Sequence, residues 1–188
     1  MEKKKSFTIY YLLLCEGTTE FNLFAYLTRV KYRELFDNSA IKFSDRVQIV
    51  ESNVSQGKLN GAGSLGGFKA KYDAIKNKYP GQTLFFVLDK DLDESSQIET
   101  MIQNGGDVSQ FLMYNSEHLL LRLDGKNPSQ PSDFPNLKDF RDYCKAEFIN
   151  HYGKEAVRFK DRDFELIFSK LSDDEVRATF IELFATLS

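Results

Sequence analysis

An apolar run near the amino terminus, followed at once by an acid and a glycine, constrains the fold more than any other stretch. Residues 9–15 read Ile-Tyr-Tyr-Leu-Leu-Leu-Cys, and Glu16-Gly17-Thr18-Thr19-Glu20 comes directly after. A continuous apolar run without polar alternation is typical of a strand buried on both faces of a parallel sheet. The glycine turn and a threonine N-cap predict a helix from about Thr19 to Leu35. We therefore expect Glu16 at the carboxyl end of a central strand, where open α/β sheets bind ligands.

A second continuous apolar strand is predicted at Gln82–Leu88, and it runs straight into Asp89-Lys90-Asp91-Leu92-Asp93. Strands that alternate with helices predict an α/β fold with a mostly parallel, four-stranded sheet flanked by helices. The other expected elements are strands at Arg46–Val50 and Ser109–Tyr114 and helices at Phe68–Tyr79, about Glu94–Gln103 and Leu119–Leu123, the last begun by Asn115 or Ser116.

The segments between these elements differ in composition. Phe36–Asp45 is a polar connection, Glu51–Gly67 is rich in glycine and has no apolar period, and Asp124–Asn136 holds three of the four prolines. Leu137–Ser188 is predicted to form two or three helices. The expected organisation is an α/β domain over residues 1–123 and a helical C-terminal extension, residues 124–188, packed on the same domain.

Composition narrows the classes of function. The chain has 188 residues, enough for one domain with a substantial core, and 28 acidic against 25 basic residues give a net charge of -3. Strong unaided binding of nucleic acid is therefore not indicated, although divalent ions offset the carboxylates of a metal-dependent enzyme. Two cysteines and two histidines give no zinc spacing, so we expect reduced thiols and a cytoplasmic protein. No membrane span is expected, and the oligomeric state is left open.

Acidic residues follow both long predicted strands, and in a parallel sheet these strand ends lie at the same edge. Asp89 and Asp91 can turn toward one point there, and carboxylate oxygens suit Mg²⁺ or Mn²⁺. Taken alone, Glu16 would be read as a solvated loop residue and the acidic run as a cap for the next helix. The combination of two acidic strand ends favours a metal site.

These residues resemble the motifs of TOPRIM domains. Leu-Leu-Leu-Cys-Glu-Gly-Thr-Thr-Glu at 12–20 is similar to the first motif, and Val-Leu-Asp-Lys-Asp at 87–91 is similar to the second, a strand that ends in Asp-x-Asp. The resemblance covers about the first 115 residues. RloB-like and OLD-type TOPRIM nucleases look closest; Tyr114–Leu121 is similar to a third RloB-like segment but lacks its Phe and Trp.

The resemblance implies metal-dependent phosphodiester chemistry on nucleic acid, either DNA or RNA. Glu16 would act as general acid or base, Asp89 and Asp91 would hold Mg²⁺ or Mn²⁺, and Asp93 or Glu20 would be accessory. RloB-like proteins are associated with restriction and phage-defence loci, which implies an effector with a protein partner. The alternative is a non-catalytic TOPRIM-like module that binds nucleic acid, a nucleotide or a partner protein.

Four further residues are candidates for accessory or substrate-binding roles: Glu117, His118, Lys58 and Lys69. A lone histidine such as His118 is more often structural or exposed. Gly61–Gly66 spells G-x-G-x-x-G, but it does not follow its strand directly, so a flexible loop is favoured over a dinucleotide site. A third option is a substrate-phosphate loop in which Lys58, Lys69 and Lys71 lie beside backbone amides.

Overall fold

A parallel sheet forms the centre of the molecule in the computed structural model, which describes residues 9–38, 41–43, 65–90 and 94–187. Strands β1 (Ile9–Cys15), β3 (Thr83–Asp89) and β4 (Val108–Leu112) lie side by side, and the short β2 (Ile41–Phe43) pairs with the outer side of β1. All pairs are parallel, with Leu13 opposite Phe85 and Phe85 opposite Val108. The predicted α/β class and parallel sheet are confirmed.

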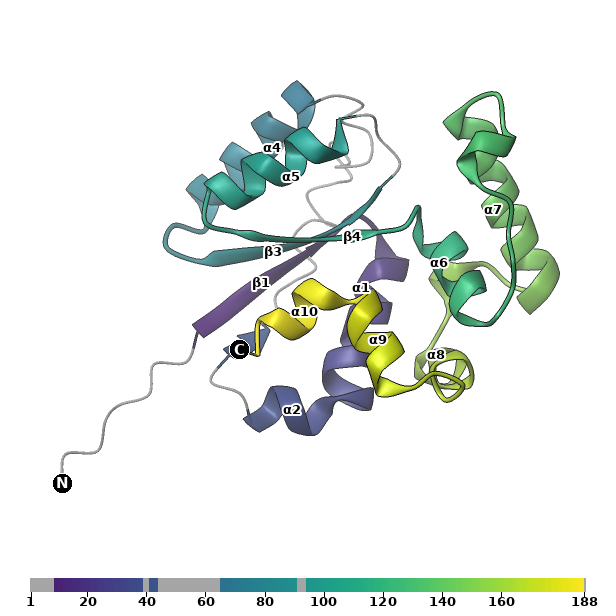
Figure 1. The fold of residues 1–188 in the computed structure, drawn as a ribbon. Coiled ribbons are helices and arrows are strands. Elements are labelled where there is room, and N and C mark those ends of the chain that lie inside the picture. Colours follow the sequence, from purple (N-terminus) through teal and green to yellow (C-terminus); the bar gives the residue numbers. More distant parts are fainter. Residues whose placement is uncertain (1–8, 39–40, 44–64, 91–93, 188) are drawn as a thin grey trace.

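Helices α4 (Leu65–Lys78) and α5 (Ser95–Asn104) cover one face of the sheet (Figure 1). This face buries alternate residues of the two long strands, among them Leu14 and Phe86, against Phe68, Tyr72 and Ile102 of the helices. The intervening strand residues are buried on the other face. Burial on both faces explains why the two runs are apolar without alternation.

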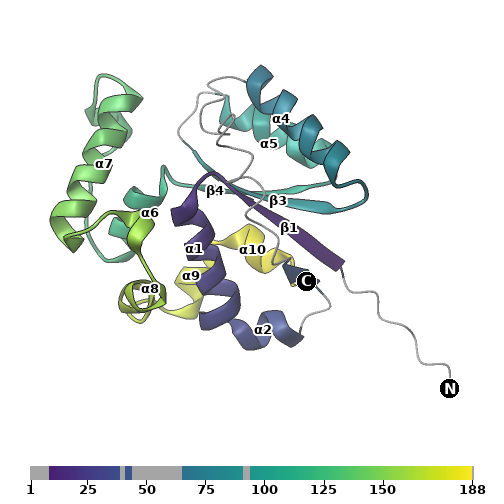
Figure 2. The same ribbon diagram turned by 180° about the vertical axis from the view of Figure 1, so that it is seen from behind.

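The other face of the sheet carries the helix that follows β1 and the C-terminal helices (Figure 2). The chain after β1 forms α1 (Thr18–Tyr26), a π-helical turn η1 (Leu27–Lys31) and α2 (Arg33–Asn38). Three later helices complete this layer: α8 (Asp161–Phe168), α9 (Asp173–Thr179) and α10 (Ile181–Ala185). None of the helices in the described parts of the chain is long and apolar enough to cross a membrane.

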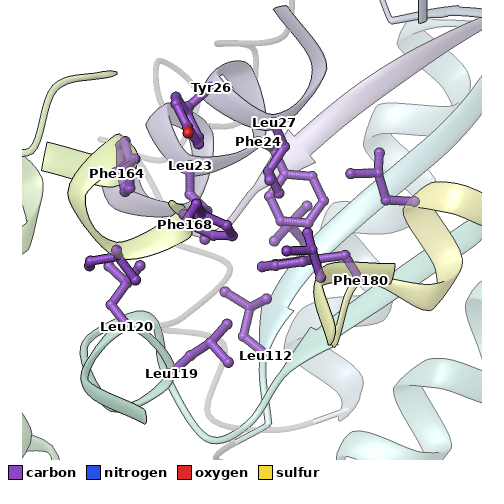
Figure 3. Packing of buried hydrophobic residues seen from close by; sticks show 14 of the residues in the cluster. Leu23, Phe24, Tyr26, Leu27, Leu112, Leu119, Leu120, Phe164, Phe168 and Phe180 are labelled. Atoms are coloured by element: carbon purple, nitrogen blue, oxygen red, sulfur yellow. The ribbon is translucent and has the colours of Figure 1, made fainter. Parts of the chain in front are cut away.

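Aromatic side chains from both halves of the sequence form one buried cluster between these helices and the sheet (Figure 3). The Phe24 ring of α1 lies 5.6 Å from the Phe180 ring and 6.1 Å from the Phe85 ring of β3, measured between centroids. Tyr26 stacks on Phe164 of α8 at 5.5 Å. The C-terminal helices therefore share a core with the first helix and the sheet.

Helix α6 (Ser116–Leu123) follows β4 and leads to a lateral arm of the molecule, visible on opposite sides of Figures 1 and 2. The arm consists of a short 3₁₀ turn η2 (Pro131–Asp133), the long helix α7 (Leu137–Tyr152) and a second 3₁₀ turn η3 (Ala156–Arg158). Asp124, just after α6, accepts a hydrogen bond from His151 Nε2 of α7 at 3.0 Å and one from Lys170. One carboxylate thus ties the arm to the segment after α8.

Four element predictions need correction. Phe36–Asp45 is not only a polar connection, because β2 lies within it; Ile-Lys-Phe is too short an alternation to stand out in the sequence. The predicted strand Arg46–Val50 lies outside the described residues. Helix α4 begins at Leu65, three residues earlier than predicted, and β4 ends at Leu112 rather than Tyr114. The described part of Leu137–Ser188 forms four α-helices rather than two or three.

Candidate functional site at the carboxyl edge of the sheet

The carboxyl ends of β1, β3 and β4 meet at one edge of the sheet, and the acids that follow β1 and end β3 are in direct contact. The Glu16 backbone N–H donates to the carbonyl of Val87 at 3.0 Å. The Asp89 backbone N–H in turn donates to Glu16 Oε2 at 3.0 Å. Both side chains are half-buried. The parallel register therefore holds the Glu16 carboxylate against the residue that begins the Asp-x-Asp motif.

Several predicted site residues cannot be placed beside this pair. Asp91, Asp93 and Lys58 lie outside the described residues. Within the ranges that the structure describes, no group of three or more His, Cys, Asp or Glu side chains is arranged to hold a metal ion. The described portion of the edge thus supplies the Glu16 carboxylate, held against the backbone of Asp89.

Helix α4 brings positive charge to the same edge. Its first residue, Leu65, donates its backbone N–H to the Glu94 carboxylate, so the amino end of α4 lies near the start of α5. Lys71, one of the lysines of the predicted phosphate loop, is half-buried; burial lowers its pKa, and the Glu16 charge acts in the opposite direction. Lys69 is instead exposed and pairs with Asp73 at 2.6 Å. Of these two lysines, Lys71 is the one coupled to Glu16.

Glu20 lies one helical turn beyond Glu16 and is only 5% exposed. Burial raises its pKa, and the nearby negative charge of Glu117 adds to that effect, while hydrogen bonds from Ser116 and the backbone oppose it. A side chain at Gly17 would place its Cβ 2.9 Å from Glu20 Oε2. The glycine of the Glu-Gly motif therefore leaves room for a buried carboxyl.

Helix α6 positions Glu117 beside Glu20. Asn115 caps the helix, because its side chain accepts a hydrogen bond from the His118 backbone N–H at 2.9 Å. The Ser116 hydroxyl donates to Glu117 Oε2 at 3.3 Å and also interacts with Glu20. Ser116, which the sequence suggested only as a possible helix start, links the two acids.

His118 is fully buried and does not reach the edge. Its ring packs against Tyr114 and Phe140, with centroids 5.3 and 5.6 Å away, and Nδ1 lies 3.4 Å from the Met113 carbonyl. Burial lowers its pKa, which favours the neutral ring. The placement supports a role in the core rather than the accessory role predicted for it.

A pocket of about 300 Å³ opens beside Glu117. It is lined by Thr19 from α1, Glu117 from α6 and residues of α7 and of the segment that forms η3. No sequence signal identified this pocket, because its walls come from segments that are distant in the chain and have no motif.

Replacing Glu20 by glutamine tests the cost of its burial. A raised pKa means that folding favours the protonated Glu20 carboxyl. Its favourable contribution to stability is present below the pKa of the unfolded chain, near 4.5, and is lost as the pH rises through the pKa of the folded protein. Glutamine imitates the protonated form, so we expect Glu20→Gln to raise the free energy of unfolding at pH 8 and to have little effect below pH 4. Urea unfolding across this pH range measures the difference.

The exposed Glu34→Gln serves as the control and should change stability by less than about 0.5 kcal/mol. Equal stability of wild type and Glu20→Gln at both pH values would show that burial of Glu20 carries no cost.

Comparison with known proteins gives no further guide: no family model matches the chain, and no curated protein or solved structure matches it. The interpretation of the edge therefore depends on its geometry. Three features need explanation. The Glu16 carboxylate lies against the Asp89 backbone, and its charge interacts with that of Lys71. The buried Glu20 lies near the half-buried Glu117, which lines a pocket.

Proposed function

We propose that this chain carries out Mg²⁺- or Mn²⁺-dependent phosphodiester chemistry on nucleic acid at the carboxyl edge of its sheet. The observation that carries the proposal is the 3.0 Å hydrogen bond from the Asp89 backbone to Glu16 Oε2, which makes the two acidic strand ends immediate neighbours. This arrangement is what the resemblance to TOPRIM nucleases implies for Glu-Gly and Asp-x-Asp motifs on adjacent strands. A four-stranded TOPRIM fold is part of the same proposal.

The donor set fits a hard divalent cation. Mg²⁺ keeps several waters and is commonly held by one or two carboxylates together with substrate phosphates, so the Asp89 carboxylate would hold the ion together with a second carboxylate and the substrate. Asp91 is the next carboxylate of the motif in the sequence. The ion would neutralise the charge that develops on the phosphoryl oxygens.

Glu16 would transfer a proton to or from the attacking or leaving oxygen, as general acid or base. Lys71, midway along α4, would bind a phosphate, and its charge interacts with that of Glu16. We further propose that the protein is a cytoplasmic effector associated with defence or restriction, acting with a partner protein.

A second candidate function is supported by Lys71 itself. A lysine coupled to Glu16 can supply the positive charge that a metal would otherwise provide. In that case the edge binds a nucleotide, a nucleic acid or a partner protein through Lys71 and does no chemistry.

Metal binding by calorimetry distinguishes the two functions. We expect the wild type to bind Mg²⁺ and Mn²⁺, and Asp89→Asn to weaken binding at least about tenfold, because one of few charged oxygen ligands is lost. The substitution keeps the backbone N–H that contacts Glu16, so the sheet edge should remain intact. Asp73→Asn, which removes an exposed carboxylate on α4, is the matched control. If the wild type binds neither ion at millimolar concentration, the metal-dependent chemistry is excluded and the non-catalytic binding function is favoured.

A further inference from the structure

The pocket beside Glu117 has a lining that limits what can occupy it. Its walls are apolar, with Phe148 and Ile149 from α7 facing the pocket together with Ala156 and Val157 from η3. Ile149 and Val157 are 41% and 43% exposed, so the pocket presents apolar surface to solvent. A flat apolar group entering between these walls would cover both side chains.

Three charged side chains complete the lining: Glu117, Glu155 and Lys145. Glu155 also pairs with the Arg158 guanidinium at 3.3 Å, so the positive and negative charges around the pocket nearly balance and leave no surplus positive charge for a phosphate. A guanidinium is positively charged and has only hydrogen-bond donors, so the Lys145 ammonium would repel it and find no acceptor on it. A neutral planar group with both donors and acceptors, such as a nucleobase, complements carboxylates and ammonium together.

The position of the pocket connects it with the carboxylate edge. Thr19 lies three residues after Glu16 in the turn that begins α1, and Glu117 lies in the first turn of α6 after β4. A strand of nucleic acid with one base in the pocket would therefore run past the ends of β1 and β3. Unpaired bases are commonly bound between apolar or aromatic side chains and recognised through their hydrogen-bonding edges.

We propose that this pocket binds an unpaired nucleobase, so that the substrate at the carboxylate edge is single-stranded or locally unpaired nucleic acid. This inference rests on the proposed function. Glu117 and Glu155 would accept hydrogen bonds from amino and ring N–H groups of the base, and Lys145 would donate to an acceptor on it. The apolar walls would supply the stacking and packing contacts.

Fluorescence anisotropy of the full chain tests the pocket. The probes are a labelled single-stranded oligonucleotide and an abasic backbone of the same length and charge, each as DNA and as RNA, measured in Glu16→Gln to prevent cleavage. We expect the oligonucleotide to bind about tenfold or more tightly than the abasic backbone, since base contacts of this kind contribute that much. Unphosphorylated nucleosides should compete.

Val157→Trp fills the mouth of the pocket from an exposed position and should remove the preference for the oligonucleotide. Val30→Trp, at a 46% exposed position on η1 that is not part of the pocket lining, should leave it unchanged. Equal binding of the two probes, or equal behaviour of the two tryptophan variants, would overturn the proposal. The proposal would also be overturned if nucleosides do not bind but an arginine-containing peptide does, and if Val157→Trp abolishes binding of the peptide. That result would favour a protein partner.

The outcomes separate this proposal from the proposed function. One outcome is that the wild type shows neither metal binding nor cleavage and still prefers the oligonucleotide in a way that Val157→Trp removes. That result would support nucleobase binding by the pocket and contradict the metal-dependent chemistry. If the wild type cleaves nucleic acid and Val157→Trp cleaves single-stranded substrate equally well with no change in affinity, the metal-dependent chemistry is supported and nucleobase binding by the pocket is contradicted.

Discussion

Replacing Phe180 by alanine is expected to lower the free energy of unfolding by about 3–5 kcal/mol. The side chain is fully buried at the junction of α9 and α10, and its ring packs on Phe24 at 5.6 Å and on Phe168 at 6.1 Å. Truncation removes contacts with α1 and α8 together and leaves a cavity in a core that also includes the sheet. Urea unfolding followed by circular dichroism measures the loss.

The neighbouring residue provides a matched control. Ile181 is 61% exposed, so Ile181→Ala should change stability by no more than about 0.5 kcal/mol. A single transition that moves as a whole in Phe180→Ala would show that the C-terminal helices unfold with the sheet. A separate early transition, with the remainder unchanged, would show that residues 124–188 form an independent unit.

Replacing Glu16 by glutamine is expected to reduce metal-dependent cleavage of nucleic acid by a factor of about 10²–10⁴. Glutamine has nearly the same shape, and its side-chain carbonyl can still accept the hydrogen bond from the Asp89 backbone, so the fold should persist. It cannot exchange a proton at neutral pH. Cleavage of plasmid DNA and of a structured RNA, each with Mg²⁺ and with Mn²⁺, measures the effect.

The comparison with Asp89→Asn assigns the two carboxylates to different tasks. Glu16→Gln should retain at least part of the metal affinity while losing turnover, whereas Asp89→Asn should lose affinity for the ion first. A Glu16→Gln protein with wild-type cleavage would exclude Glu16 as the proton-transfer group. Activity of both variants at the wild-type level would place the chemistry elsewhere.

The sequence was sufficient to predict those parts of the fold that local pattern determines. The runs at 9–15 and 83–88 are strands because both of their sides are buried, and this leaves a continuous apolar signature. The three-residue β2 has no such signature and is held by its pairing with β1. Helix α4 begins with Leu65-Gly66-Gly67, which propensity disfavours, and the contact of Leu65 with Glu94 helps to hold that end.

The candidate site also has features that the sequence could predict and features that it could not. Parallel topology alone predicts that the ends of β1 and β3 meet, and the contact between Glu16 and the Asp89 backbone follows from register. The coupling of Lys71 to Glu16 and the pocket walls depend on how α4, α7 and η3 dock, which is decided by packing between distant segments. His118 lies directly after an acid in the sequence, yet the aromatic residues Tyr114 and Phe140 enclose it.

The lateral position of α7 has a consequence for how such a protein can diverge. Its closest packing partners are α6, η2 and η3, whereas Glu16 and Asp89 depend on strands β1 and β3. Substitutions at Lys145, Ile149 or Val157 can therefore reshape the pocket without disturbing the register of the sheet. Selection could alter what the arm recognises while Glu16 and Asp89 stay in place, so that the same sheet acquires new specificities through changes in α7 and η3.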